Sequence, residues 1–345
     1  MLAAGDLSEP GRAGTRRSGP SPQRRRTRRG RDRTRTCRAR RRRPGGREHG
    51  SGPAAISSAI YAIRKGLKIG LIGDSVGGQV STTNDIENII GTPKTTGSDF
   101  SMSLEKHAKE YEIPFHKGHL VTKVELDGKD KIVTSDDDLK FRTKTIIIAT
   151  GAKHRELNIE GEKEFTGRGV HYCSTCDGPF YRNLDVVIVG GGNSGVEAAL
   201  DLSNIAKSVT LMEFMKDLKA DEVLQKKAYE NPKITVMTNV QTKKVKGTQF
   251  VTELEYMNRE TEEVKTLKTD GIFVEIGLMA NTKVFENLVD MNRIGEIVID
   301  NANMTSVEGI FAAGDCTTVM HKQIIISMGE GAKAALSAFN YILNN

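Results

Sequence analysis

Residues 184–213 read LDVVIVGGGNSGVEAALDLSNIAKSVTLME, and this stretch decides the fold. The apolar run at 184–189 predicts a buried strand, and the glycines at 190–195 predict a tight turn. A helix is expected over 196–205 and a second strand over 208–212. Strand–helix–strand alternation of this kind is typical of a parallel sheet, so the chain is expected to be an α/β protein.

The glycine turn in this stretch predicts a dinucleotide site. Gly190 permits the tight turn, Gly192 lets a pyrophosphate approach the backbone, and Gly195 lets the helix pack closely on the strand. Glu213 ends the next strand, where an acid can bind an adenine-ribose diol. A merely structural glycine turn is the alternative, but strand, helix and acid agree on binding. The predicted site comprises Gly190, Gly192, Asn193, Ser194, Gly195 and Glu213.

A second glycine cluster lies near the N-terminus and is incomplete. Gly50, Gly52 and Ala55 form a GxGxxA pattern, a helix and a strand follow, and Asp74 lies where a ribose-binding acid could sit. Residues 45–49 cannot be the buried strand that should precede the turn. Alone, this cluster leaves nucleotide binding and a structural turn equally open.

The charge distribution argues against nucleic-acid binding. Residues 1–50 hold 17 of the 51 basic residues, all Arg, and 4 of the 44 acidic residues. The remainder holds 34 basic and 40 acidic residues, so the globular body is mildly acidic. It has no excess of positive charge that would bind phosphate backbones. Residues 1–49 lack hydrophobic periodicity and are expected to be disordered. The sequence has no apolar run of membrane-spanning length, so no membrane span is expected.

The cysteines point to redox chemistry. Residues 173–177 read CSTCD, and such a pair can be a redox disulfide, half of a zinc site or two inert thiols. His171 adds only one further ligand and Cys316 is distant, so we favour the disulfide and expect no metal. Asp177 could protonate a leaving thiolate, or it could merely cap the following helix. Four cysteines do not make a secreted framework, so a reducing, cytoplasmic compartment is expected.

At this point the sequence resembles a known family. It resembles the low-molecular-weight thioredoxin reductases, and still more the reductase core of the alkyl hydroperoxide reductase flavoprotein subunit. The resemblance covers residues 50–345. It is carried by Gly77-Gly78-Gln79, Ile86-Glu87-Asn88, Ile148-Ala149-Thr150-Gly151-Ala152, Cys173-Ser174-Thr175-Cys176-Asp177-Gly178, Gly309-Ile310-Phe311-Ala312-Ala313-Gly314-Asp315-Cys316 and Lys322-Gln323-Ile324.

The resemblance implies a discontinuous architecture with two Rossmann-like domains, that of the class II pyridine nucleotide-disulfide oxidoreductases. An FAD domain would comprise residues 50–156 and 282–345. An NAD(P) domain carrying the C-x-x-C pair would be inserted at 157–281. In the family these domains rotate so that the flavin meets either the disulfide or the nicotinamide, and the enzyme is a homodimer.

The resemblance also implies residue roles. Cys173 would attack the partner disulfide, Cys176 would lie against the flavin, Asp177 would be the acid/base and Asp315 would contact the ribityl chain. The implied FAD residues are Gly50, Gly52, Ala55, Asp74, Gly77, Gly78, Gln79, Asn88, Ala149, Thr150, Gly151, Gly314, Asp315, Lys322, Gln323 and Ile324.

Two departures from the family refine the expected function. NADPH-using members carry a His-Arg-Arg run where this chain has EFMKD at 213–217, and a glutamate there favours NADH. The peroxide-linked flavoprotein also carries an N-terminal module with its own C-x-x-C, which we do not find. We therefore expect a disulfide reductase that passes electrons from NADH through FAD to a thioredoxin-like or glutaredoxin-like protein, which could feed a peroxiredoxin. The alternatives are an NADH oxidase or alkyl hydroperoxide reductase flavoprotein, and a zinc- or nucleic-acid-binding protein.

The N-terminal stretch is expected to be foreign to this enzyme. It uses 17 Arg and no Lys, whereas residues 51–345 use 7 Arg and 27 Lys. The change falls at Gly50, and the stretch replaces the strand that should precede this glycine. A transit peptide or a nucleic-acid-binding arm would precede that strand and not replace it. We expect that no other segment supplies the strand, and that the chain therefore holds FAD poorly.

Overall fold

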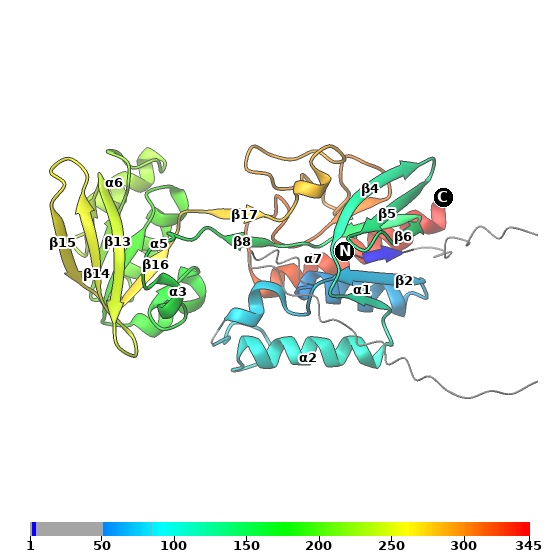
Figure 1. The fold of residues 1–345 in the computed structure, drawn as a ribbon, viewed down its shortest axis with the longest axis horizontal. Coiled ribbons are helices and arrows are strands. Elements are labelled where there is room, and N and C mark those ends of the chain that lie inside the picture. Colours follow the sequence, from blue (N-terminus) through cyan, green and yellow to red (C-terminus); the bar gives the residue numbers. More distant parts are fainter. Residues whose placement is uncertain (1, 5–50, 84) are drawn as a thin grey trace, which may run out of the picture.

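The computed structural model describes residues 2–4, 51–83 and 85–345, which form two lobes joined by two extended segments (Figure 1). Apart from Leu2–Ala4, the Arg-rich stretch and Gly50 lie outside the described residues, so the expected disorder and foreign origin of this stretch stay predictions. Within the described residues, no helix has the length and apolar character needed to cross a bilayer.

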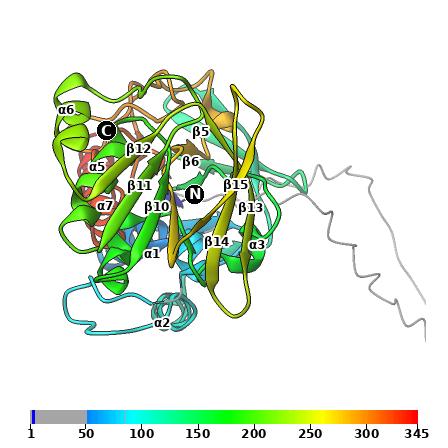
Figure 2. The same ribbon diagram turned by 90° about the vertical axis from the view of Figure 1, so that its left-hand side faces the viewer.

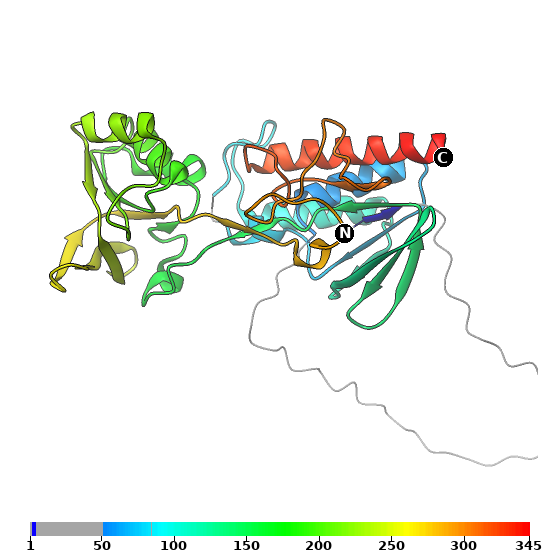
Figure 3. The same ribbon diagram turned by 90° about the horizontal axis from the view of Figure 1, so that it is seen from above.

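The first lobe has three layers, with helices on one face of a central sheet and a smaller sheet on the other (Figure 3). The central sheet has the order β18-β7-β1-β2-β3. Its strands are β18 (Ile310–Ala312), β7 (Thr145–Ile148), β1 (Leu2–Ala4), β2 (Ile69–Gly73) and β3 (Phe115–Lys117). The helices are α1 (Pro53–Arg64), α2 (Gly97–Glu110) and α7 (Ile324–Asn344), and the antiparallel second sheet contains β4 (Val121–Asp127), β5 (Asp130–Ser135) and β6 (Lys140–Thr143). Because β7 is covered on both faces, its four residues are all buried.

The strand position before the first glycine turn is filled, which corrects the sequence expectation. Leu2–Ala4 pairs antiparallel with both β2 and β7, with Leu2 opposite Leu71 and Ile147. The expectation that no other segment supplies a strand there is therefore wrong. This three-residue segment completes the backbone pairing of the sheet, since the facing edges of β2 and β7 would otherwise lack partners. Because β1 runs antiparallel to its neighbours, it does not lead into the glycine turn as a parallel strand would.

The second lobe confirms the strand–turn–helix–strand prediction. Its parallel sheet has the order β12-β11-β10-β16-β9 and is seen side-on with its antiparallel companion in Figure 2. The parallel strands are β9 (Val170–His171), β10 (Asp185–Val189), β11 (Ser208–Met212), β12 (Ile234–Met237) and β16 (Gly271–Val274). The helices are α5 (Asn193–Ser203) and α6 (Glu222–Glu230), and the companion sheet contains β13 (Val240–Gly247), β14 (Val251–Asn258) and β15 (Val264–Lys268). The α/β class with two Rossmann-like units is confirmed, although the antiparallel β1 makes the first-lobe sheet mixed.

Two strands connect the lobes. These are β8 (Ala152–His154) and β17 (Leu278–Ala280), which pair antiparallel (Figure 1). The domain boundaries expected at 156 and 281 stay predictions. The remaining elements are short: α3 (Glu162–Phe165), α4 (Ser174–Asp177), and the 3₁₀ turns η1 (Gly78–Thr82), η2 (Gly178–Tyr181) and η3 (Lys283–Phe285).

Small residues hold α1 and α7 close together in the first lobe. Ala55, Ala59, Ala334 and Ala338 are fully buried between these helices and the sheet. A Cβ atom on Gly331 would lie 2.2 Å from the Ala54 carbonyl oxygen, so the two helix backbones meet at this glycine. The position of α1 therefore depends on Gly331.

We expect Gly331→Ala to lower the free energy of unfolding by about 1–3 kcal/mol, because one helix must move away from the other. Gly329→Ala on the same helix is the matched control. A Cβ at Gly329 meets nothing within 4 Å, so this change should be neutral or stabilise by up to about 1 kcal/mol through helix propensity. Thermal and urea unfolding of both variants test this, and equal stabilities would contradict the close approach.

Candidate active site

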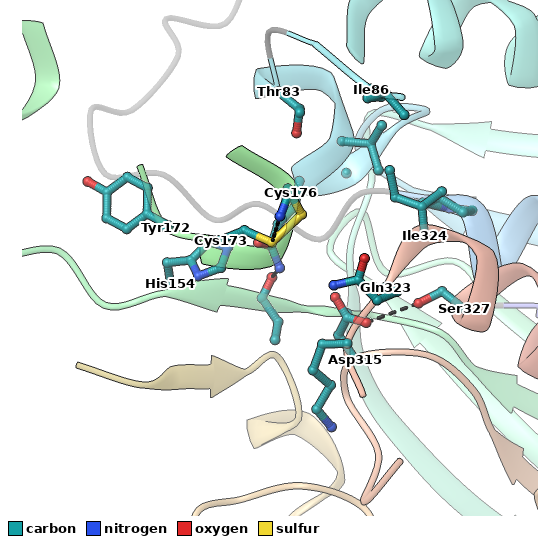
Figure 4. Close-up of a pocket in the computed structure, with 18 of the residues that line it drawn as sticks. Thr83, Ile86, His154, Tyr172, Cys173, Cys176, Asp315, Gln323, Ile324 and Ser327 are labelled. Atoms are coloured by element: carbon teal, nitrogen blue, oxygen red, sulfur yellow. Dashed lines mark hydrogen bonds between the residues drawn. A yellow bond between two sulfur atoms is a disulfide. The ribbon is translucent and has the colours of Figure 1, made fainter. Parts of the chain in front are cut away.

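A cavity of about 460 Å³ lies between the lobes. The first lobe contributes its glycine turn at the start of α1, the segment around η1, and the loop that precedes α7. The second lobe contributes α4 and the residues around β9. Figure 4 shows Cys173 and Cys176 on one side of this cavity and Asp315, Gln323 and Ile324 on the other. The cysteine pair and the expected flavin residues therefore face a common space.

Cys173 and Cys176 form a disulfide, as the sequence favoured. Cys173 is the N-cap of α4, and its sulfur accepts a hydrogen bond from the Cys176 amide at 3.2 Å. Cys316 is a buried free thiol in the first lobe, and its burial raises its pKa. Of the readings considered for the C-x-x-C pair, the disulfide agrees with this geometry, whereas zinc ligation needs two free thiolates.

Asp177 does not cap the helical turn that follows it. Its side chain makes no capping hydrogen bond, and its Oδ2 atom instead lies 3.1 Å from His171 Nδ1. The other ring nitrogen of His171 lies 2.7 Å from the Tyr181 hydroxyl. Burial raises the pKa of Tyr181 above its usual range, so this phenol keeps its proton and donates it to the ring. In a neutral His171, Nδ1–H then donates to Asp177.

His171 was considered from the sequence only as a spare zinc ligand, and its contact with Asp177 was not foreseen. The two side chains are mostly buried, with 11% and 16% of their surface exposed. A histidine two positions before the first cysteine was the available signal. It did not reveal the contact because α4 must turn the chain back before the carboxylate reaches the ring.

Glu275 is a second residue that sequence reasoning missed. It follows β16, and its Oε1 atom accepts a hydrogen bond from the Ser174 amide at the start of α4, at 3.3 Å. Burial raises the pKa of Glu275 to about 7. The signal was the one that identified Glu213, an acid at the carboxyl end of a buried strand. This side chain connects the disulfide segment to the sheet that carries the second glycine turn.

The first-lobe side of the cavity fits a flavin dinucleotide. The N-cap of α1 is Gly52, which has no side-chain cap, so the helix N-terminus is available to a pyrophosphate. A Cβ on Gly78 would lie 3.5 Å from the Gly52 Cα, which shows how closely these glycines approach. Asp315 is partly buried, which raises its pKa, and it accepts a hydrogen bond from the Ser327 hydroxyl at 3.0 Å. A partly buried carboxylate beside a cavity is suited to accepting hydrogen bonds from ligand hydroxyls.

The structure brings most of the expected flavin residues together. Those that line the cavity are Gly52, Gly77, Gly78, Gln79, Asn88, Ala149, Thr150, Gly151, Asp315, Lys322, Gln323 and Ile324. Three others lie behind or beside it. Ala55 is fully buried in α1, Gly314 packs on Ala54 and Ser327, and Asp74 is exposed after β2. Gly50 lies outside the described residues.

The second glycine turn lies elsewhere, since none of its residues lines this cavity. Gly192 is the uncapped N-cap of α5, and a Cβ there would meet nothing within 4 Å, which leaves room for a pyrophosphate. A Cβ on Gly195 would lie 1.8 Å from the Gly190 carbonyl oxygen, so helix and strand do pack closely there. Glu213 bends over the turn and accepts a hydrogen bond from the Gly191 amide at 2.5 Å.

Two contacts near Glu213 were not foreseen. Asn193 is exposed, and its side chain pairs with Asp221 through two hydrogen bonds of 2.8 and 3.0 Å. The Arg259 guanidinium lies 3.7 Å from the centre of the Phe214 ring, so a basic group lies beside the segment after Glu213. The residues near Glu213 in the sequence did not indicate Arg259, because Arg259 follows β14 in the companion sheet.

Comparison with known proteins agrees with this geometry. The pyridine nucleotide-disulphide oxidoreductase family matches residues 50–331. Over 297 residues the chain is 48% identical to a protein of Bacillus subtilis named NADH dehydrogenase, covering 86% of this chain and 58% of the relative. Over 296 residues it is 49% identical to a Staphylococcus aureus protein named as a subunit of alkyl hydroperoxide reductase, with the same coverage. The chain thus spans somewhat over half the length of these relatives.

Solved structures show the same architecture. Thioredoxin reductase from Streptococcus pyogenes superimposes with a TM-score of 0.82 at 34% identity, covering 86% of this chain and 97% of that one. Thioredoxin reductase from Giardia duodenalis gives a TM-score of 0.80 at 27% identity, covering 85% and 97%. The likeness extends over both lobes, and its family is the one that the sequence motifs indicated.

The buried Glu275 makes a testable contribution to stability. Its pKa of about 7 lies above the ordinary value of 4.5, so between these pH values the folded chain binds the extra proton. The favourable contribution of the protonated Glu275 carboxyl group to the free energy of unfolding is therefore fully present below pH 4.5. It is lost as the pH rises through 7 and the group ionises. We expect Glu275→Gln, which keeps the acceptor for Ser174, to raise the free energy of unfolding at pH 8 by up to about 3 kcal/mol and to have little effect at about pH 4.5.

Urea unfolding of the oxidised protein at both pH values measures this difference. Glu286→Gln, at an exposed position, is the control and should change neither value. If the free energy of unfolding of Glu275→Gln changes between the two pH values by as much as that of the parent, the assignment is refuted.

Proposed function

The chain belongs to the pyridine nucleotide-disulphide oxidoreductase family, and from this premise we propose that it transfers electrons from NADH through FAD and the Cys173–Cys176 disulfide to a disulfide of another protein. The family implies a flavin and a pyridine nucleotide. The observation that carries the proposal is the shared cavity, which both the disulfide and the expected flavin residues line (Figure 4). A structural disulfide would have no need of such a position.

In this proposal the chain holds FAD through backbone and carboxylate groups of the first lobe. The N-terminus of α1 receives the pyrophosphate, and Asp315 accepts hydrogen bonds from hydroxyl groups. When bound, FAD supplies a two-electron relay between the nicotinamide and the sulfur pair.

The sulfur pair then performs thiol–disulfide exchange. After reduction, the Cys173 thiolate attacks the partner disulfide, forms a mixed disulfide and releases one partner thiolate. The Cys176 thiolate attacks the Cys173 sulfur, which reforms the internal disulfide and releases the second partner thiolate. The two electrons of the internal dithiol thus reduce one partner disulfide to two thiols. Each released thiolate takes up one proton.

Asp177 is the proposed acid/base for those protons. Its carboxylate is not engaged in capping and contacts the imidazole of His171 at 3.1 Å. His171 is proposed as the positioning residue, because its second nitrogen is held by Tyr181 and its ring orientation is thereby fixed. Such a carboxyl group can give up a proton to a leaving thiolate and regain it from solvent.

Access of NADH requires a movement of the lobes. The glycine turn at Gly190 and the acid at Glu213 do not line the cavity that the disulfide lines. We propose that the lobes rotate about the β8–β17 connection, so that the nicotinamide site and the disulfide take turns at the flavin. Each lobe has its own central sheet and buried core, so such a rotation would leave both cores intact.

The proposed partner is a thioredoxin-like or glutaredoxin-like protein, which can in turn reduce a peroxiredoxin. This part of the proposal draws on the names of similar proteins, among them an alkyl hydroperoxide reductase and two thioredoxin reductases. A homodimer is proposed on the family resemblance.

We expect Cys173→Ser and Cys176→Ser each to abolish NADH-driven reduction of a thioredoxin or glutaredoxin disulfide, because exchange needs one attacking and one resolving thiol. Cys316→Ser is the matched control and should retain activity, since its hydroxyl can replace the thiol contacts to the Ile148 and Ala313 carbonyls. Steady-state assays with FAD supplied in excess make the comparison.

Oxygen consumption is measured in the same assays. Near-parental disulfide reduction by either single mutant would eliminate the proposed route. Undiminished oxygen reduction together with no disulfide reduction by the parent would instead identify an NADH oxidase.

We expect NADH to be used at least about tenfold better than NADPH in kcat/KM, a difference of about 1.4 kcal/mol, because Glu213 would repel a 2′-phosphate. Glu213→Gln should reduce this ratio severalfold, mainly through a lower KM for NADPH. Arg259 lies beside the same segment, and Arg259→Gln should increase the ratio if its charge assists a phosphate. Equal kcat/KM values for both coenzymes in the parent protein would contradict the assignment.

A further inference from the structure

Two histidines and an aspartate converge on the surface of the first lobe, outside the cavity. His116 is on β3, His119 lies in the turn directly after β3, and Asp137 lies in the turn between β5 and β6. Each offers a nitrogen or oxygen atom, and these three atoms lie within 4.8 Å of one another. Among residues 2–4, 51–83 and 85–345, these three residues are the one group of at least three histidine, cysteine or acidic ligands that lie this close together. None of the three lines the cavity.

The separations suit a transition-metal ion. Asp137 Oδ2 lies 3.1 Å from His116 Nε2 and 3.7 Å from His119 Nδ1. Ligand atoms that lie about 2.0–2.1 Å from a tetrahedral zinc ion are roughly 3.3 Å from one another. The two measured distances bracket this value, so the ligand atoms are spaced for one ion, although a ring must turn before both in-plane lone pairs can point at it.

The surroundings position His116 and Asp137. His116 packs on Phe141 and stacks on His119 at 4.1 Å with 12° between the ring planes, so binding of one ion by both rings would turn one of them out of this stack. The Ser135 hydroxyl donates to Asp137, which orients this carboxylate as an outer-shell group does in known metal sites. The two turns are joined by the Asp136 amide, which donates to the Leu120 carbonyl at 2.8 Å.

The formal charge of the group also favours binding of a cation. Two neutral imidazoles and the carboxylates of Asp136 and Asp137 carry a formal charge of −2, which a divalent ion would balance. Asp136 Oδ1 lies 2.8 Å from His119 Nδ1, so it can become a fourth ligand or yield to water. Simple histidine–aspartate pairing would account for each of these contacts alone. It does not require His119 Nδ1, which lies 2.8 Å from Asp136 Oδ1, to lie 3.7 Å from Asp137 Oδ2 as well.

We propose that His116, His119 and Asp137 form a site for a divalent transition-metal ion of the Zn²⁺ class. Imidazole with carboxylate is a ligand set typical of zinc, whereas Mg²⁺ and Ca²⁺ prefer oxygen ligands alone. The ion would tie the turn after β3 to the turn after β5. The Gly118 amide in the first of these turns donates to the carbonyl oxygens of Gly73 and Asp74, so the ion would also brace the carboxyl end of β2.

The test uses the full chain without an affinity tag, with the Cys173–Cys176 disulfide intact so that these sulfurs cannot bind metal. Chelator-treated protein is titrated with ZnCl₂ by calorimetry and with CoCl₂ by visible absorption. We expect one equivalent of Zn²⁺, and a cobalt ligand-field spectrum that Zn²⁺ displaces. His116→Gln, His119→Gln and Asp137→Asn should each weaken binding by at least about tenfold. They should also lose the increase in melting temperature that Zn²⁺ gives the parent.

His107→Gln and Asp138→Asn are the matched controls, a histidine outside the group and the aspartate next to Asp137, and both should bind as the parent does. Far-ultraviolet circular dichroism verifies folding, and His119→Gln in its exposed turn replaces His116→Gln if the latter fails to fold. Absence of zinc uptake by the parent, or parental affinity and cobalt spectrum in the three ligand variants, would overturn the proposal.

Discussion

The antiparallel pairing of β8 with β17 is the constraint on which the arrangement of this molecule depends. It sets His154 opposite Leu278 and Ala152 opposite Ala280, and it joins the two lobes where the chain passes between them. Each lobe buries its own core, so the lobes need little from each other to fold. The position of one lobe relative to the other is therefore not dictated by the burial of either core. In the arrangement observed, that position brings the disulfide to the cavity and leaves the second glycine turn away from it.

Strand ends of the second lobe concentrate the functional groups at one edge. The parallel strands β10, β11 and β16 are followed directly by Gly190, Glu213 and Glu275 respectively. The backbone binds these ends together, since the Gly190 amide donates to Met212 and the Glu275 amide donates to Val189. Glu275 then extends the edge to α4 through Ser174. The glycine turn and the disulfide segment are thus connected through one carboxylate and the strand ends.

Sequence patterns predicted what depends on neighbours along the chain. The turn at Gly190, the strand before it and the Cys173–Cys176 pair each lie within a few residues, and a local pattern sufficed for them. Contacts between distant segments were missed, because periodicity carries no information about which loops meet. Glu275 lies 101 residues from Ser174, and Arg259 reaches Phe214 from another sheet. The strand Leu2–Ala4 was missed for a related reason, since a three-residue segment has no pattern to recognise.

Asp177 shows how such a distant contact changes a chemical argument. From sequence, a carboxylate after the second cysteine could equally cap the next turn or exchange protons. A capping carboxylate accepts hydrogen bonds from backbone amides, which hold it in its charged form. The Asp177 side chain makes no such bond and faces an imidazole whose far nitrogen is occupied by a phenol that retains its proton. One ring hydrogen is thereby directed at the carboxylate, and the fold places both side chains among the residues that line the cavity with the sulfur pair.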